Sequence, residues 1–277
     1  MRGVIKLANE KLVILGFIVI FYIATHAAYN IEHEEATLQE LRCEKDNPRK
    51  VVNYIIPGML RVPKSAFQPF VNEMVGDVVF VDLNCTVWDS KLFAKQIVED
   101  AKAKGYLDVR IFAISIGDKV ARKIDSKIGH DLRKAGAVIT TYDINPCANR
   151  AEAASGSRIG LVLGAPLFRL VTFLLGPLGY LDIIPGDRPS KSDPNRHSLV
   201  ELSSQIWAIA FEDTGKFGRS SNLVLSKEDA RLNNRQIRED AERDNSIAVI
   251  NSGHADIIGY RDNYLDALND LGAFDDD

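Results

Sequence analysis

Short apolar runs alternate with amphipathic stretches along most of this chain. The runs are rich in β-branched residues and span five to seven positions, which is typical of buried strands. Because they are almost continuously apolar rather than alternating, they predict a parallel sheet that is covered on both faces. The runs lie at residues 51–56, 77–83, 109–114, 137–142, 222–226 and 246–250.

Segments with helical spacing separate these apolar runs. In residues 90–104, Leu92, Ile97 and Ala101 share one face, and Gly105 follows as a helix end. Alternating strands and helices predict an α/β fold, with a mostly parallel sheet of about six strands and helices on both faces. The other predicted helices lie at residues 119–128, 228–244 and 260–271.

The N-terminal segment has a different pattern. Residues 1–11 are basic, and residues 12–29 form an apolar run without Asp, Glu, Lys or Arg. A run of about 18 residues is near the lower limit for spanning a bilayer. We expect residues 1–30 to be a signal anchor with its basic end in the cytoplasm. A cleaved signal peptide and a buried core helix are the alternatives. The first two interpretations place the rest of the chain outside the cytoplasm, either membrane-anchored or secreted.

The remaining chain divides by composition. Residues 31–50 are polar and charged and are predicted to form a stalk. The strand-and-helix rhythm then defines a core in two parts, residues 51–149 and 221–277. Between them, residues 150–220 are apolar and interrupted by Gly and Pro, which predicts an insertion into the core rather than a further strand–helix unit.

Charge and cysteine content exclude some classes of function. The 277 residues carry a formal net charge of −4, and the basic residues are scattered, so we expect no nucleic-acid partner. The three cysteines, Cys43, Cys85 and Cys147, form no CxxC pair or Cys/His cluster. The sequence therefore predicts neither a metal site nor a cofactor.

The strongest local motif lies between a predicted strand and a predicted helix. Residues 113–117 (AISIG) place Ser115 between the small residues Ala113 and Gly117. A sharp strand-to-helix turn that exposes a serine needs small neighbours at these two positions. The motif resembles the GxSxG nucleophile elbow of the α/β-hydrolase superfamily, although Ala113 replaces the first Gly and Asp118 stands where many members have a further Gly. The alternative is an ordinary loop with a helix-capping serine.

The resemblance implies a catalytic triad in the chain order nucleophile, acid, histidine. His254 lies just beyond the last predicted strand and matches the family's histidine loop. Asp229 follows the preceding strand and is the expected acid, which would hold the tautomer of His254 that accepts the serine proton. Glu228 and Asp143, the latter placed just past the strand at 137–142, are the alternative acids.

The resemblance also implies an oxyanion hole. One backbone N–H should come from Ile116, the residue after the nucleophile. The other should come from Met59, because residues 55–59 (IIPGM) resemble the family's His-Gly loop with Pro in place of His. A plain Pro-Gly turn is the alternative interpretation of this segment.

The family's usual activity is what the resemblance implies for this chain. We expect a serine hydrolase of the carboxylesterase or lipase type, which cleaves an ester through an acyl-enzyme. A peptidase or amidase on the same fold and a non-catalytic binding protein remain the alternatives. Residues 150–220 fall where the family carries its cap, and their apolar character favours an acyl or lipid-like substrate. The family's first two strands are expected to be missing.

Overall fold

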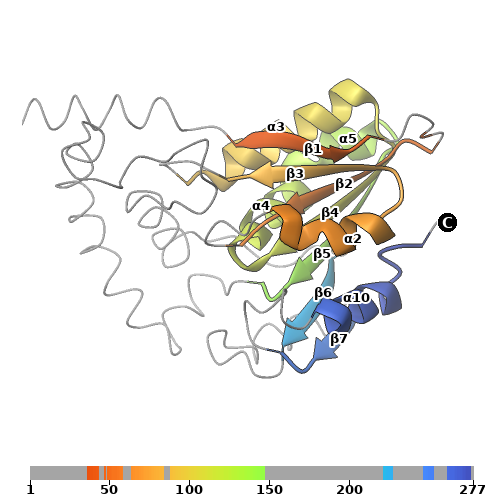
Figure 1. Ribbon diagram of the computed structural model, residues 1–277. Helices are drawn as coiled ribbons and strands as arrows, with labels where there is room; N and C mark the ends of the chain where they lie inside the picture. The colour runs from red at the N-terminus through yellow and green to blue at the C-terminus, as the bar shows by residue number, and fades with distance from the viewer. Residues whose placement is uncertain are drawn as a thin grey trace, which may run out of the picture.

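The computed structural model describes residues 36–43, 47, 49–58, 64–83, 88–146, 221–226, 246–252 and 261–275. Within these ranges the chain forms a seven-stranded sheet in the order β1-β3-β2-β4-β5-β6-β7 (Figure 1). The predicted anchor at residues 1–30, the insertion at 150–220 and the charged helix at 228–244 lie outside the described residues.

Six strands of this sheet are parallel, which confirms the predicted mostly parallel architecture. Strand β2 has all six side chains buried, as the continuous apolar run predicts. The parallel strands are β2 (Val51–Ile56), β3 (Asp77–Asp82), β4 (Asp108–Ile114), β5 (Val138–Ile144), β6 (Ser221–Ser226) and β7 (Ile247–Ile250).

The seventh strand corrects three sequence-based expectations: that residues 31–50 form only a stalk, that no strand precedes Val51, and that the sheet has about six strands. Residues Thr37–Arg42 form β1, which pairs antiparallel with β3 at the edge of the sheet. The Arg42 guanidinium donates hydrogen bonds to the carbonyls of Val71, Met74 and Gly76, so it links this edge to helix α2 and to the chain that follows it. None of the β1 side chains is fully buried, which explains why its hydropathy shows no strand signal.

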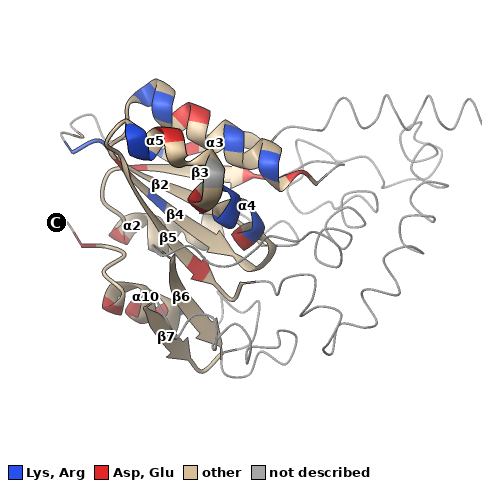
Figure 2. Ribbon diagram, turned by 180° about the vertical axis from the view of Figure 1, so that it is seen from behind, with Lys and Arg blue, Asp and Glu red and all other residues tan. Residues whose placement is uncertain are grey.

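Helices cover both faces of the sheet. On one face lie α3 (Ser90–Lys104), α4 (Asp118–Lys123) and α5 (His130–Lys134) (Figure 2). On the other face lie the 3-10 turn η1 (Lys64–Phe67), α2 (Gln68–Glu73) and α10 (Arg261–Asp270) (Figure 1). The helices on each face pack their own apolar core against the sheet, which lies between the two helical layers.

Helix α3 has the predicted bounds because both of its ends are capped. The Asp89 carboxylate accepts hydrogen bonds from the N–H groups of Lys91 and Leu92 at 2.9 and 3.0 Å. At the other end, Gly105 adopts a left-handed conformation with φ of 69° and closes the helix.

The helix predicted at 119–128 is not continuous. Helix α4 ends at Lys123, and residues Ile124–Ile128 form a π-helical segment, η3, with a non-helical Ser126. The Gly129 N–H donates to the Ile124 carbonyl, five residues back, at 2.8 Å. A Cβ atom at position 129 would lie 2.3 Å from that carbonyl oxygen, so the wide turn requires glycine there.

Among the helices that the structure describes, none combines the length and the apolar character needed to cross a bilayer. The apolar run at residues 12–29 lies outside the described residues.

Candidate active site

Ser115 lies at the turn from strand β4 into helix α4. Ile114 is extended, with φ of −113° and ψ of 128°, and Ser115 opens the 3-10 turn η2 (Ser115–Gly117) that leads into α4. Ser115 itself has φ of +52°. A serine rarely adopts this left-handed conformation, which costs energy and is concentrated at functional sites. The sequence-predicted elbow therefore has the strained backbone that a nucleophile at a strand–helix turn requires.

Two glycines hold the turn against the end of strand β2. A Cβ atom on Gly58 would lie 3.2 Å from the Cβ of Ser115, so Gly58 lets the two loops approach closely. A Cβ atom on Gly117 would lie 2.9 Å from the carbonyl oxygen of Pro57. The predicted oxyanion loop therefore packs directly on the elbow. Its expected donor, Met59, lies outside the described residues, while Ile116 is fully buried in the turn.

Asp118 begins helix α4 immediately after the turn and is fully buried. Its carboxylate lies 2.6 Å from the guanidinium of Arg122, one helical turn further on. A carboxylate in the first turn of a helix interacts favourably with the helix dipole, and the arginine compensates its burial. The ion pair therefore accommodates Asp118 at the position where the motif that residues 113–117 resemble often has a further glycine, and the turn is kept.

Asp143, an alternative acid, lies inside strand β5 rather than just past it, because β5 extends to Ile144. Burial raises the pKa of its carboxyl well above the usual range, and the charge of Asp118 raises it further, while Arg122 and the Ser221 hydroxyl lower it. The side chain is fully buried, and neither oxygen meets the geometry of a hydrogen bond with a described residue. These surroundings favour a neutral carboxyl group.

The other predicted triad residues lie outside the described part of the chain. These are Asp229, its alternative Glu228, and His254. The structure does place the strand ends that lead to them. Strand β6 ends at Ser226, three residues before Asp229, and Ser252 is described two residues before His254. Since β4, β6 and β7 run in the same direction, both segments leave the sheet from the edge that carries Ser115.

A buried polar cluster at this edge was not predicted from the sequence. Asn145, Ser226, Ser252 and Tyr264 are joined by hydrogen bonds, and each is at most 1% exposed. Among the described residues, Asn145 is also one of three non-glycine residues with positive φ, at 47°. The available signal was a polar residue at the end of each of three apolar strands or within two positions of it, but which of these residues meet depends on tertiary structure.

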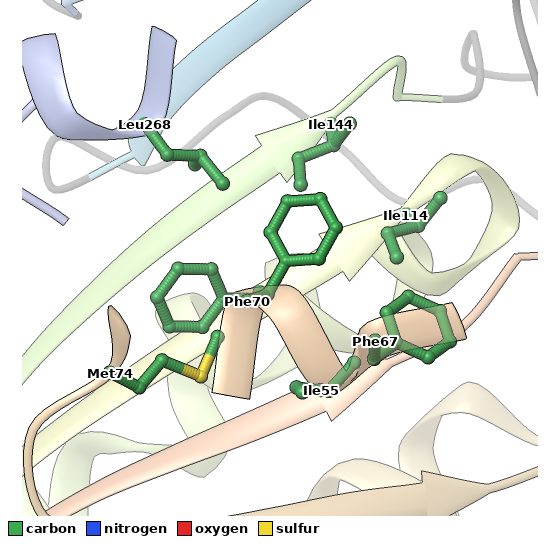
Figure 3. A pocket seen from close by; sticks show the side chains of 8 residues that line it. Ile55, Phe67, Phe70, Met74, Ile114, Ile144 and Leu268 are labelled. Carbon is green, nitrogen blue, oxygen red and sulfur yellow. The ribbon is translucent and has the colours of Figure 1, made fainter. Parts of the chain in front are cut away.

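An apolar hollow lies on the opposite side of the sheet from α4, between the sheet and helices α2 and α10 (Figure 3). The space within it amounts to only about 10 Å³, about enough for one water molecule. All eight lining side chains are apolar, so the hollow offers no group for acid–base or nucleophilic chemistry. The lining residues are Ile55, Phe67, Phe70, Met74, Phe112, Ile114, Ile144 and Leu268.

Over the ranges that the structure describes, no group of three or more His, Cys, Asp or Glu side chains is arranged to hold a metal ion.

Comparison with known proteins gives matches at the level of structure. No protein-family model matches the sequence, and no curated protein matches it significantly. A carboxylesterase of the ammonia-oxidizing thaumarchaeon Nitrososphaera gargenis superposes with a TM-score of 0.57 at 11% identity, over 86% of this chain and 94% of that one.

Two further solved structures are similar. An α/β-hydrolase enzyme from a Medee basin deep-sea metagenome library gives a TM-score of 0.57 at 13% identity, over 86% of this chain and 94% of that one. The enol-lactonase of Burkholderia xenovorans LB400 gives 0.56 at 13% identity, over 86% and 97%. This chain therefore has the α/β-hydrolase fold, as the predicted resemblance implies.

Proposed function

We propose that this protein is a serine hydrolase that cleaves a carboxylic ester or a lipid-like ester, with Ser115 as the nucleophile. The observation that carries the proposal is the positive φ of Ser115 at the turn between β4 and α4. An ordinary helix-capping serine has an extended backbone and gains nothing from this strain. The strain is explained if the turn must present the hydroxyl group to a substrate. The esterase and lactonase neighbours have this same fold.

The proposed reaction proceeds through an acyl-enzyme. The Ser115 Oγ attacks the ester carbonyl carbon while His254 takes its proton, and the backbone N–H groups of Ile116 and Met59 stabilise the resulting oxyanion. His254 then gives the proton to the leaving alcohol as the C–O bond breaks. Water attacks the acyl-enzyme, His254 accepts and returns a proton, and the carboxylic acid leaves with Ser115 restored.

The strand geometry supports His254 as the base. Strand β7 lies three strands from β4, which is about 14 Å at the usual strand spacing. Four residues of chain from Ile250 to His254 span up to about 14 Å, and the imidazole adds further reach. His254 is therefore within range of Ser115 from its own strand end.

Asp229 is the proposed acid. A triad acid must be ionised so that it can stabilise the imidazolium that forms during the reaction. Asp143 does not suit this role, because burial and the charge of Asp118 raise its pKa well above the usual range. Asp229 follows β6, the strand beside the one that leads to His254.

Reaction with a fluorophosphonate probe tests the nucleophile, and Ser115→Ala is the control variant. We expect the wild-type protein to be labelled and the variant not to be. Turnover of short-chain and long-chain nitrophenyl esters, compared with peptide amides, tests the substrate class. Hydrolysis of amides in preference to esters would make the protein a peptidase or amidase, and a folded wild-type protein that is not labelled would make it a non-catalytic member.

We further propose that residues 1–30 direct the protein to the membrane or out of the cytoplasm, on the basis of the basic flank and the apolar run at 12–29. Fractionation of expressing cells tests this proposal. We expect the full chain in the membrane fraction after carbonate washing, or a shortened chain outside the cytoplasm. A full-length protein in the cytoplasmic fraction would contradict it.

A further inference from the structure

We infer that Asn145, Ser226, Ser252 and Tyr264 form a positioning ring that holds the carboxyl ends of β5, β6 and β7 on helix α10, and so fixes the segments that carry Asp229 and His254. This inference rests on the proposed function and adds four positioning residues to it. None of the four is proposed to contact the substrate.

The donor and the acceptor of each hydrogen bond in the ring can be assigned. The backbone N–H of Ser226 donates to Asn145 Oδ1 at 2.9 Å, which settles the orientation of the Asn145 amide. Its Nδ2 group then donates to Tyr264 Oη at 2.8 Å. The Ser226 hydroxyl donates to Asn145 Oδ1, also at 2.8 Å.

Two further contacts close the ring. Ser226 Oγ lies 2.8 Å from Ser252 Oγ, and Ser252 Oγ lies 2.9 Å from Tyr264 Oη. Since the Ser226 proton points to Asn145, Ser252 donates to Ser226 and Tyr264 donates to Ser252. Each of the three hydroxyl groups therefore donates one hydrogen bond within the ring. Hydrogen bonds that follow one another in this way strengthen one another.

The ring lies at the level of the nucleophile. In the register of β4 and β5, Ile114 pairs with Ile144, so Ser115 and Asn145 are the next residues of two adjacent strands. Both leave the sheet with positive φ, at 52° and 47°. The Asn145 N–H also donates to the Val224 carbonyl of β6 at 2.8 Å. This bond is the last ladder contact between β5 and β6, and the Asn145 side chain continues the link by accepting hydrogen bonds from Ser226 of β6.

Two members of the ring lie immediately before the proposed catalytic segments. Ser226 is the last residue of β6, three positions before Asp229, and Ser252 is two positions before His254. Tyr264 supplies the third anchor from α10, a helix whose Leu268 is packed in the core. The ring is fully buried, so breaking it leaves polar groups without water to replace the lost bonds. It can therefore hold both segments in place more tightly than the strand ends alone.

Tyr264→Phe tests the inference because, with little change in volume, it removes the hydroxyl group that contacts Asn145, Ser252 and, at 3.3 Å, Ser226. Tyr54→Phe is the matched control: Tyr54 is equally buried, and its hydroxyl donates to Asp100 at 2.6 Å on the other face of the sheet. The measurements are the rate of fluorophosphonate labelling, kcat and KM for a nitrophenyl ester, and thermal unfolding. Ser252→Ala and the double variant with Tyr264→Phe complete the set.

We expect both tyrosine variants to lose similar stability, but only Tyr264→Phe to lower kcat and the labelling rate, by about tenfold or more, with KM within about twofold of wild type. The double variant should lose little beyond Tyr264→Phe alone, since both break the same ring. If wild type is labelled and Tyr264→Phe matches Tyr54→Phe in kcat, the ring is merely structural and only this inference fails. If folded wild type is not labelled, the proposed function fails and the inference fails with it.

Discussion

A Cβ atom on Gly117 would lie 2.7 Å from the carbonyl oxygen of Ile56, so the elbow and the end of strand β2 are in direct backbone contact. This contact brings the segment after β2 beside Ser115, where the second oxyanion donor is proposed to lie. The glycine at the end of the motif is thus required by packing between two loops as well as by the sharpness of the turn.

We predict that Gly117→Ala separates these loops. The added methyl group meets backbone atoms that cannot rotate away, and overpacking of this kind costs about 1–3 kcal/mol. The shift of the turn should lower the ester hydrolysis rate by about 100-fold, because reacting groups must be aligned closely. Urea unfolding and initial-rate kinetics on the purified variant measure the two effects.

Gly136→Ala is the control for this substitution. Gly136 lies before β5, at the amino ends of the strands, and has φ of 91° with no atom within 4 Å of an added Cβ. Alanine there strains the backbone by about 1–2 kcal/mol without touching the elbow. It should lose stability and keep its activity. Equal loss of activity in both variants would show that the effect of Gly117→Ala is general destabilisation.

The buried carboxyl of Asp143 predicts a pH-dependent stability. Its folded pKa is raised, first by burial and then by Asp118, against the lowering effects of Arg122 and Ser221. As pH rises above about 4, the unfolded chain releases this proton before the folded protein does, so Asp143 lowers the free energy of unfolding. Asp143→Asn cannot titrate, and it should gain stability relative to wild type between about pH 4 and 8.

Chemical unfolding of both proteins across this pH range measures the difference. Asp131→Asn on the exposed side of α5 makes the same substitution at the surface and serves as the control. A difference between wild type and Asp143→Asn that stays constant with pH would contradict the raised pKa.

The choice of triad acid predicts three different outcomes for three amide variants. Asp229→Asn should lower kcat by about 10⁴-fold, because the amide favours the wrong histidine tautomer. Asp143→Asn and Glu228→Gln should keep kcat within a few-fold of wild type, with labelling of Ser115 retained. A large loss in Asp143→Asn, together with an active Asp229→Asn, would instead make Asp143 the acid.

Strong local signals made much of the fold predictable. The strand at 51–56 and the helix at 90–104 have the predicted bounds, because every strand side chain is buried and the helix carries Asp89 and Gly105 as caps. Strand β5 was predicted two residues short at its end, because Asp143 is polar yet fully buried. Helices α2 and α5 have only six and five residues, too few for a periodic pattern.

The candidate site, like the fold, was predictable only in part. The turn at Ser115 was predictable because small residues, strand and helix lie within a few positions of one another. The ring around Asn145 was not, because its partners lie up to 119 residues apart. The antiparallel edge strand β1 and the break at Ser126 likewise depend on contacts that hydropathy does not record.

The most direct test of the account is to identify the residue that a fluorophosphonate probe modifies. Peptide mapping by mass spectrometry of the labelled full-length protein should find the phosphonyl group on Ser115, and Ser115→Ala should remain unlabelled while unfolding at a temperature close to wild type. Modification of a different residue, or no labelling of the folded wild-type protein, would contradict the assignment of Ser115 as the nucleophile.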